Sequence, residues 1–238
     1  MPKINKSDTP HMYRHLVLMT LLVALGLPGP AQDITTPERT LVEVRTRLGT
    51  MVVALHNETP MLRDRFISRV LDHSIDSTLL HRVVPGFAIE GGDPASKNAP
   101  AGIPLGLDPD TIGFPTPVEH GRIHRLGVLS ASPAGDTTTL TGRVHRDRFF
   151  IVLGVPYSAR ELEALHAHPG PDTARITYTE EDRRIYATVG GTPHLDGRCT
   201  VFGEVVHGLE VLDAIARTPC NTWDRPIEDI PIFTRILP

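Results

Sequence analysis

The chain has 238 residues and a formal net charge of −4, with 40% hydrophobic and 22% charged residues. These values are ordinary for one soluble globular domain, and the slightly acidic balance gives no support to a nucleic-acid partner. The counts of 20 glycines and 22 prolines favour a turn-rich β protein over a helical bundle.

The first 31 residues have the features of a secretory signal peptide. Arg14 and His15 precede the apolar run 16–27, and small residues stand at the positions that would lead to cleavage after Ala31. The run of about 12 apolar residues is too short to span a bilayer. Met12 is a candidate for the true start, because the residues before it are polar and unlike such a signal.

We therefore expect an exported protein, located in the periplasm, in the cell envelope or outside the cell, with no stable membrane span after cleavage. A short linker is expected over residues 32–39 and one domain over 40–238. The two cysteines, Cys199 and Cys220, could form a disulfide that closes a loop of about 20 residues and stabilises the fold by roughly 3 kcal/mol. Two separate thiols fit the sequence equally well, because geometry decides this.

Apolar periodicity predicts strands along most of the chain. A hairpin around Gly49 joins strands at 40–48 and 50–56, and a helix runs from Pro60 to about residue 72 with Thr59 as its N-cap. Residues 93–124 have the composition of a long loop, which in a compact domain is often functional. The remaining predicted elements are strands near 78–84, 87–91, 125–130, 148–153, 200–206 and 229–236, and a second helix at 209–216.

Residues 155–190 change in character and predict an inserted helical hairpin. Ser158 and Glu161 form a capping box at the start of its first helix, and Thr179 precedes three acidic residues at the start of its second. Strands spread along the chain, with two lone helices about 150 residues apart, fit a closed antiparallel barrel plugged at both ends.

Residues 80–94 (LHRVVPGFAIEGGDP) contain two charges, Arg82 and Glu90, within apolar strands. Charged side chains at such positions are usually paired or face a groove. An ion pair at a sheet edge would explain them. A cationic donor held over an apolar pocket floored by Phe87 would explain them as well.

This stretch resembles the signature of the cyclophilins, the barrel-shaped peptidyl-prolyl isomerases, whose pattern is close to FHRVIxGFMIQGGD. The catalytic arginine of that pattern falls on Arg82 and the pocket phenylalanine on Phe87. Ala88 stands where the family has methionine, and Glu90 where it has glutamine.

Two more blocks carry the same resemblance. Residues 190–206 (GGTPHLDGRCTVFGEVV) match the family pattern TPxLDGxxxVFGxV, with Leu195 on the pocket leucine. His194 takes a position often held by tryptophan, and Cys199 one often held by histidine. Residues 127–132 (GVLSAS) and 148–151 (RFFI) match a third block, with Phe150 on the second pocket phenylalanine. Arg148 replaces a substrate-binding glutamine there, and Pro133 replaces an asparagine.

The resemblance implies a mainly β fold: a closed eight-stranded antiparallel barrel capped by two helices, here with the helical insertion. It implies a monomeric peptidyl-prolyl cis-trans isomerase (EC 5.2.1.8) that assists the folding of exported proteins and binds proline-containing unfolded or exported polypeptides without a cofactor or metal. Arg82 would be catalytic. Substrate would be bound by the following residues: Phe87, Ala88, Glu90, Arg148, Phe150, His194, Leu195 and Cys199.

The substitutions leave a second function open. Ala88 would empty one pocket wall, and Arg148 and Pro133 would remove groups that bind the peptide backbone in the family. The alternative is a cyclophilin-fold peptide-binding or chaperone-like module with weak or no isomerase activity. Arg148 could instead shift the preference toward peptides with acidic flanking residues.

Two other kinds of site have weaker support. The 12 histidines include the pairs His120/His124 and His166/His168, but neither pair has a third ligand in register for a metal. A hydrolase could use Ser130 or Cys199 with His194, yet no nucleophile elbow surrounds Ser130. A varied pocket rim explains His194 and Cys199 more simply.

Overall fold

The structure is a computed structural model in which residues 38–107, 114–115, 122–134, 143–167 and 176–238 are described. The chain divides into the units Met1–Thr36 and Pro37–Pro238, and every described residue belongs to the second unit. The expected signal peptide (1–31) and most of the expected linker (32–39) lie outside the described residues. So do parts of the expected loop 93–124 and the tip of the expected hairpin.

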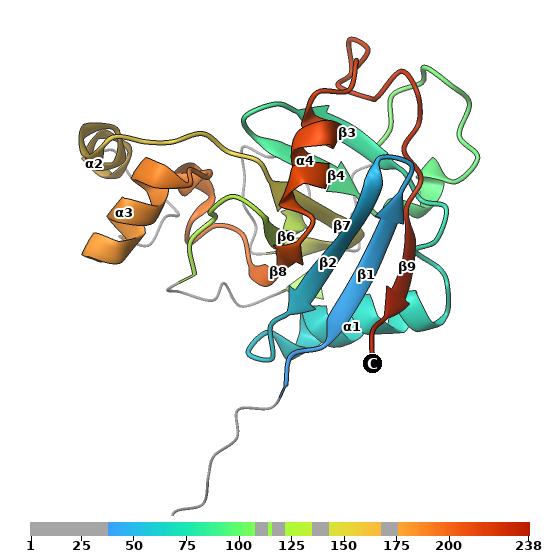
Figure 1. Cartoon of the computed structure of the whole chain (residues 1–238), viewed down its shortest axis with the longest axis horizontal. Coiled ribbons are helices and arrows are strands. Elements are labelled where there is room, and N and C mark those ends of the chain that lie inside the picture. The colour runs from blue at the N-terminus through green and yellow to red at the C-terminus, as the bar shows by residue number, and fades with distance from the viewer. Residues whose placement is uncertain (1–37, 108–113, 116–121, 135–142, 168–175) are drawn as a thin grey trace, which may run out of the picture. The chain divides into compact units, whose positions relative to one another are not determined.

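The described residues form one antiparallel sheet in the order β3-β4-β7-β6-β8-β2-β1-β9, with the short β5 paired to β7 (Figure 1). Eight of its strands agree with the sequence-based prediction in type and order. The short β5 was not predicted and lies in the expected loop 93–124, and β7 begins at Arg143, five residues before the strand predicted at 148–153. The bounds of the strands are β1 (Leu41–Thr46), β2 (Gly49–Leu55), β3 (Leu80–Val84), β4 (Ala88–Gly91), β5 (Phe114–Pro115), β6 (Val128–Pro133), β7 (Arg143–Val152), β8 (Val201–His207) and β9 (Phe233–Ile236).

The sheet curls toward closure without becoming a closed barrel, so the expectation of full closure is wrong. Its outermost strands, β3 and β9, are not paired with each other. They are joined by an isolated bridge between Leu79 and Pro231 and by backbone hydrogen bonds such as Leu80 N to Ile230 O at 2.9 Å. Pro231 has no N–H to donate, which interrupts a regular ladder at this seam.

Two helices pack against the sheet and complete its core. Helix α1 (Pro60–Leu71) and helix α4 (Leu209–Ala216) fall where the periodicity predicted them. Their apolar side chains join the inward-facing strand residues in one buried core; they are Leu62, Phe66 and Val70 of α1 and Val211, Leu212 and Ile215 of α4. Thr59 stands at the N-cap of α1, but its side chain makes no capping bond and instead donates to His56 O at 3.4 Å.

The inserted segment forms the two predicted helices, α2 (Ala159–Ala167) and α3 (Glu180–Thr188), which lie side by side in Figure 1. The expected capping box is present, because Ser158 N donates to Glu161 Oε2 at 2.7 Å and Glu161 N to Ser158 Oγ at 3.3 Å. Thr179 and Asp182 form a second one at α3. The pair has a small core of its own, centred on Leu162, Tyr178 and Tyr186.

A buried arginine, Arg225, links its own loop, which contains Asp229, to the loop 99–103. Arg225 is 1% exposed and forms an ion pair with Asp229. Its guanidinium also donates to the backbone oxygens of Ala99, Pro100 and Ile103. The segment 99–103 is therefore held by a residue more than 120 positions later in the chain.

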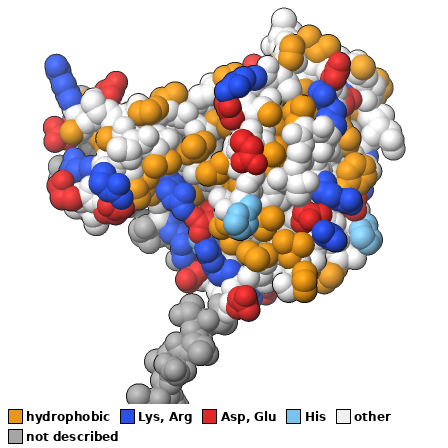
Figure 2. All heavy atoms as spheres, viewed as in Figure 1, with side chains coloured by type: hydrophobic (Ala, Val, Ile, Leu, Met, Phe, Trp, Pro, Cys, Tyr) orange, Lys and Arg blue, Asp and Glu red, His pale blue; other side chains and the backbone are white. Residues whose placement is uncertain are grey.

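Two short 3-10 helices, η1 (Pro94–Ser96) and η2 (Pro193–Leu195), complete the regular structure of the described residues. On the face shown in Figure 2, acidic and basic side chains are interspersed. In the part of the chain that the structure describes, no helix combines the length and apolar character needed to cross a membrane.

Candidate active site

A second apolar cluster lies on the opposite face of the sheet from the main core. Alternation along β7 separates the two faces: Phe149 and Ile151 join the main core, whereas Phe150 and Val152 join the second cluster. We call this second group the outer apolar cluster. Its members are Ala88, Val128, Phe150, Val152, Cys199 and Val201, with Phe87 and Leu195 half-buried against them.

Arg82 lies at the edge of this cluster. It stands directly opposite Glu90 in the β3–β4 register, and its NH1 donates to Glu90 Oε1 at 2.5 Å. A second carboxylate approaches from the C-terminal loop, with Asp224 Oδ2 3.5 Å from Arg82 Nε. The guanidinium carbon lies 5.9 Å from the centre of the Phe87 ring, and the side chain is 37% exposed. A cation is thus fixed beside apolar surface while part of it still faces solvent.

His194 and Leu195 border the cluster from the side of η2. The His194 ring stacks on Phe87 at a centroid distance of 5.7 Å and an angle of 19°. Burial, and next the nearby His124, lower the pKa of His194 below its ordinary value. At neutral pH this ring is therefore uncharged and extends the apolar wall.

Cys199 is part of the apolar surface of the site and is not suited to act as a nucleophile. Burial raises the pKa of its thiol to about 12, so the reactive thiolate is scarce at neutral pH. Cys199 and Cys220 are both free thiols, which settles the open question of a disulfide between them. Cys220 instead lies near the β3 backbone, with Sγ 3.9 Å from Val83 O.

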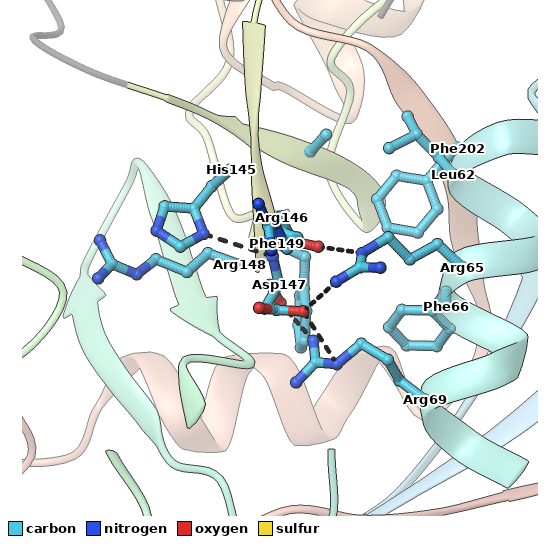
Figure 3. A pocket seen from close by; sticks show the side chains of 11 residues that line it. Leu62, Arg65, Phe66, Arg69, His145, Arg146, Asp147, Arg148, Phe149 and Phe202 are labelled. Atoms are coloured by element: carbon cyan, nitrogen blue, oxygen red, sulfur yellow. Dashed lines mark hydrogen bonds and ion pairs between the residues drawn. The ribbon is translucent and has the colours of Figure 1, made fainter. Parts of the chain in front are cut away.

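Arg148 lies on the same face of β7 as Phe150, but its guanidinium is bound elsewhere. It is buried, with Nε 3.0 Å and NH2 2.8 Å from Asp93 Oδ2 and with NH1 donating to Gly106 O at 2.7 Å. Figure 3 shows it directed away from the hollow between α1 and β7, where Asp147 faces Arg65 and Arg69. A substrate carboxylate would have to compete with Asp93 for Arg148.

Sequence reasoning missed a buried polar network behind the cluster. His124 Nδ1 lies 2.8 Å from Asp196 Oδ1, and its Nε2 lies 3.1 Å from Ser130 Oγ. The other carboxylate oxygen of Asp196 accepts hydrogen bonds from the hydroxyls of Tyr178 and Tyr186. The sequence signalled His124 only as a weak metal candidate, and Asp196 only as one residue of the matched block 190–206.

Ser130, His124 and Asp196 have the connectivity of an acyl-transfer triad, but they are closed to substrate. Ser130 and His124 are both 0% exposed. The histidine next to Ser130 is His124, so the expected partnership of Ser130 with His194 is not what the geometry provides. Without access to the serine oxygen, the arrangement supplies support to the cluster rather than a nucleophile.

Comparison with known proteins decides the family. The family described as "Cyclophilin type peptidyl-prolyl cis-trans isomerase/CLD" matches residues 41–235. The chain belongs to the cyclophilin-type peptidyl-prolyl cis-trans isomerase family. The chain is 31% identical over 221 residues to a Streptococcus pyogenes protein named as a bifunctional phosphatase/peptidyl-prolyl cis-trans isomerase, covering 90% of this cyclophilin and 42% of that protein. This cyclophilin thus spans less than half of that relative.

Other relatives agree with this assignment. A Staphylococcus saprophyticus protein named as a peptidyl-prolyl cis-trans isomerase is 30% identical over 183 residues, which cover 75% of this cyclophilin and 81% of that protein. A crystal structure of a Cryptosporidium parvum cyclophilin shares the fold with a TM-score of 0.59 and 20% identity, covering 84% of this chain and 98% of that one. A structure of the same protein in the presence of the dipeptide Ala-Pro gives a TM-score of 0.56 and 19% identity, covering 83% and 99%.

The candidate residues of this cyclophilin thus separate into two groups. Most gather on one face: Arg82 and Glu90 at the edge, with Phe87, Ala88, Phe150, His194, Leu195 and Cys199 forming the apolar surface. Arg148 forms its ion pair with Asp93. Pro133, at the end of β6, pairs with Val144. Within the described residues, no group of three or more potential ligands is arranged to hold a metal ion.

Proposed function

We propose that this chain catalyses cis–trans isomerisation of X-Pro bonds in unfolded or exported polypeptides, with Arg82 stabilising the twisted amide. The observation that carries the proposal is the fixed position of the Arg82 guanidinium at the edge of the outer apolar cluster, 5.9 Å from the Phe87 ring centre. A cation beside an apolar surface can hold a proline ring and its amide at the same time.

The chemistry requires no covalent step and no cofactor. The planar amide resists rotation with a barrier of about 18–20 kcal/mol, and in the twisted state the prolyl nitrogen becomes pyramidal and basic. A fixed guanidinium donates to that nitrogen, or to a neighbouring carbonyl, more strongly in the twisted state than in either planar isomer. Such differential binding is catalysis, and a 10⁵-fold acceleration requires about 7 kcal/mol of it.

The outer apolar cluster is the proposed site for the proline ring. Phe87, Phe150 and Leu195 surround that site, and the neutral His194 ring extends it. The removal of water around the reacting amide strengthens the hydrogen bond from Arg82. The Cryptosporidium parvum cyclophilin structure determined in the presence of Ala-Pro supports a proline-containing ligand for this fold.

One observation favours the second candidate, a peptide-binding or chaperone-like module with feeble activity. Glu90 and Asp224 both lie near Arg82, at 2.5 and 3.5 Å. The two carboxylates hold the guanidinium in place. Their negative charges also reduce the positive electrostatic potential of Arg82 at the position where the twisted amide would form. The balance between orientation and neutralisation decides between enzyme and binder.

The deciding experiment measures isomerisation of an X-Pro peptide by exchange spectroscopy, for the wild type and for Arg82→Ala. We expect a loss of about 100-fold in kcat/KM, the usual effect of removing one preorganised donor. Arg235→Ala is the matched control, because it removes an exposed arginine that pairs with Glu43 on the opposite edge of the sheet. Equal rates for the wild type and Arg82→Ala, with peptide binding intact, would establish the binding module instead.

Export and oligomeric state are part of the proposal. The composition of residues 12–31 supports a cleaved signal and a site of action outside the cytoplasm, with the mature chain working as a monomer. N-terminal sequencing of the protein recovered from the cell envelope or medium tests this. A mature terminus at Gln32 is the expected result, and an intact N-terminus on protein in the cytoplasm would overturn it.

A further inference from the structure

The inserted hairpin is hydrogen-bonded to the candidate site mainly through the carboxylate of Asp196, and Tyr178 OH also lies 3.4 Å from Pro193 O at the start of η2. Asp196 is 3% exposed and accepts four hydrogen bonds. Its Oδ1 accepts from the backbone N and the Nδ1 of His124, at 2.7 and 2.8 Å. Its Oδ2 accepts from Tyr178 OH at 2.6 Å and Tyr186 OH at 2.5 Å. We call these four residues the Asp196 cluster.

The Asp196 cluster contacts the outer apolar cluster at two places, next to η2 and at Phe150. Asp196 directly follows η2, which carries His194 and Leu195. On the other side, the His124 ring stacks on Phe150 at a centroid distance of 6.0 Å and an angle of 16°. A shift of the carboxylate would therefore move η2 and the His124 ring, which contact two different parts of the proposed proline site, together.

The two hydroxyls come from the insertion. Tyr186 lies on α3 and Tyr178 precedes it, and both are buried in the small core that includes Leu162 of α2. Burial, followed by the nearby Asp196 carboxylate, raises the pKa of both tyrosines well above the ordinary value. Both hydroxyls therefore stay protonated and remain hydrogen-bond donors at physiological pH.

We propose that Asp196, Tyr178 and Tyr186 are positioning residues for the isomerase site, and that the inserted hairpin sets the place of Leu195, His194 and Phe150 through their hydrogen bonds. The inference rests on the proposed function for its kinetic consequence. It assigns the insertion a role in shaping the site. A misplacement of about 1 Å at a reacting site can cost 10²-fold in rate, so a partial effect is expected on losing one hydroxyl.

The test removes single oxygen atoms by the changes Tyr178→Phe and Tyr186→Phe, alone and together. Tyr157→Phe is the matched control, because the Tyr157 ring meets Tyr186 at 6.4 Å while its hydroxyl is not among the donors to Asp196 in the described residues. Four quantities are measured: kcat for an X-Pro peptide, KM for that peptide, its binding affinity, and the methyl NMR signals of Leu195.

We expect the double variant to lose about tenfold in kcat/KM and to shift the Leu195 methyl signals, while Tyr157→Phe matches the wild type. Unchanged kinetics, affinity and methyl signals in both single variants would overturn the proposal. If the double variant does not fold, the single variants decide. If the wild type itself lacks isomerase activity, the proposed function fails, and the Leu195 signals with peptide affinity still decide the role of the tyrosines.

Discussion

Arg82 and Glu90 face each other across β3 and β4, with guanidinium NH1 2.5 Å from carboxylate Oε1. A neutral glutamine could accept the same hydrogen bond without opposing the positive charge. Replacing Glu90 with glutamine therefore measures how far the negative charge of the carboxylate, rather than the orientation of Arg82, limits the isomerisation rate.

Glu90→Gln should raise kcat/KM for an X-Pro peptide by about threefold, because the change keeps an acceptor for Arg82 and removes a negative charge. Exchange spectroscopy on the peptide measures the rate. Glu43→Gln, which acts on the exposed pair with Arg235, should leave the rate unchanged. A fall in rate for Glu90→Gln would mean that the carboxylate is needed to hold the arginine.

Ala88→Met should destabilise the fold by about 1–3 kcal/mol, although methionine is the family residue at this position. Ala88 is only 1% exposed, so neighbouring side chains already occupy the space and a larger side chain overpacks the outer apolar cluster. Urea denaturation measures the change in free energy of unfolding. Val189→Met, at a residue 44% exposed, serves as a control with a change near zero. A gain in stability for Ala88→Met would reveal an unfilled wall.

The stability of the fold should decrease as the pH falls from about 6.5 to 4. Burial, followed by the charge of Arg122, lowers the pKa of His56 to about 4, and the ring accepts from Arg122 NH1 at 3.4 Å. The unfolded histidine binds a proton near pH 6.5 while the folded one does not. The contribution is therefore complete above about pH 6.5 and is lost as the pH falls to 4 and below, with a size of about 3 kcal/mol.

The measurement compares urea midpoints at pH 7.5 and 4.5 for the wild type and His56→Gln. Acidic groups titrate in both proteins, so the difference between the two losses isolates His56. We expect the variant to lose less stability on acidification. Equal losses would show that His56 takes up its proton as readily in the folded chain as in the unfolded one.

Native protein at pH 7 should resist alkylation at Cys199, because that thiol is buried and its pKa is raised to about 12. Cys220 is half-buried, and burial also raises its pKa, so its labelling should be slow but faster than that of Cys199. Mass spectrometry after iodoacetamide treatment counts the modified sites. Full labelling of both thiols after denaturation, without added reductant, is the control, and its failure would point to a disulfide.

The features that could be predicted from sequence are those that arise from local patterns. Periodicity located α1 and α4, and Ser158 with Glu161 marked the start of α2. The spacing from Arg82 to Phe87 and Glu90 indicated one turn between two strands, which brings these side chains together.

The features that were missed depend on partners distant in the chain. Arg148 finds Asp93 55 positions away, and His124 finds Asp196 72 positions away. Hydrophobic periodicity does not predict such pairs, because it is a local signal and each partner alone resembles an ordinary polar residue in a loop or strand. The gap between β3 and β9 was missed for a related reason, since it depends on how the two outermost strands of the sheet, which are about 150 residues apart in the chain, meet near Pro231.

The buried Arg225 side chain has a consequence for how the protein is made. It binds backbone oxygens at 99–103, which leave the ribosome more than 120 residues before it does. Asp224, its neighbour in sequence, supplies one of the two carboxylates near Arg82. The charged groups around Arg82 therefore reach their final arrangement only when synthesis is almost finished. A nascent chain that stalls before Asp224 has strands β3 and β4 of the site but lacks one of the two carboxylates near Arg82.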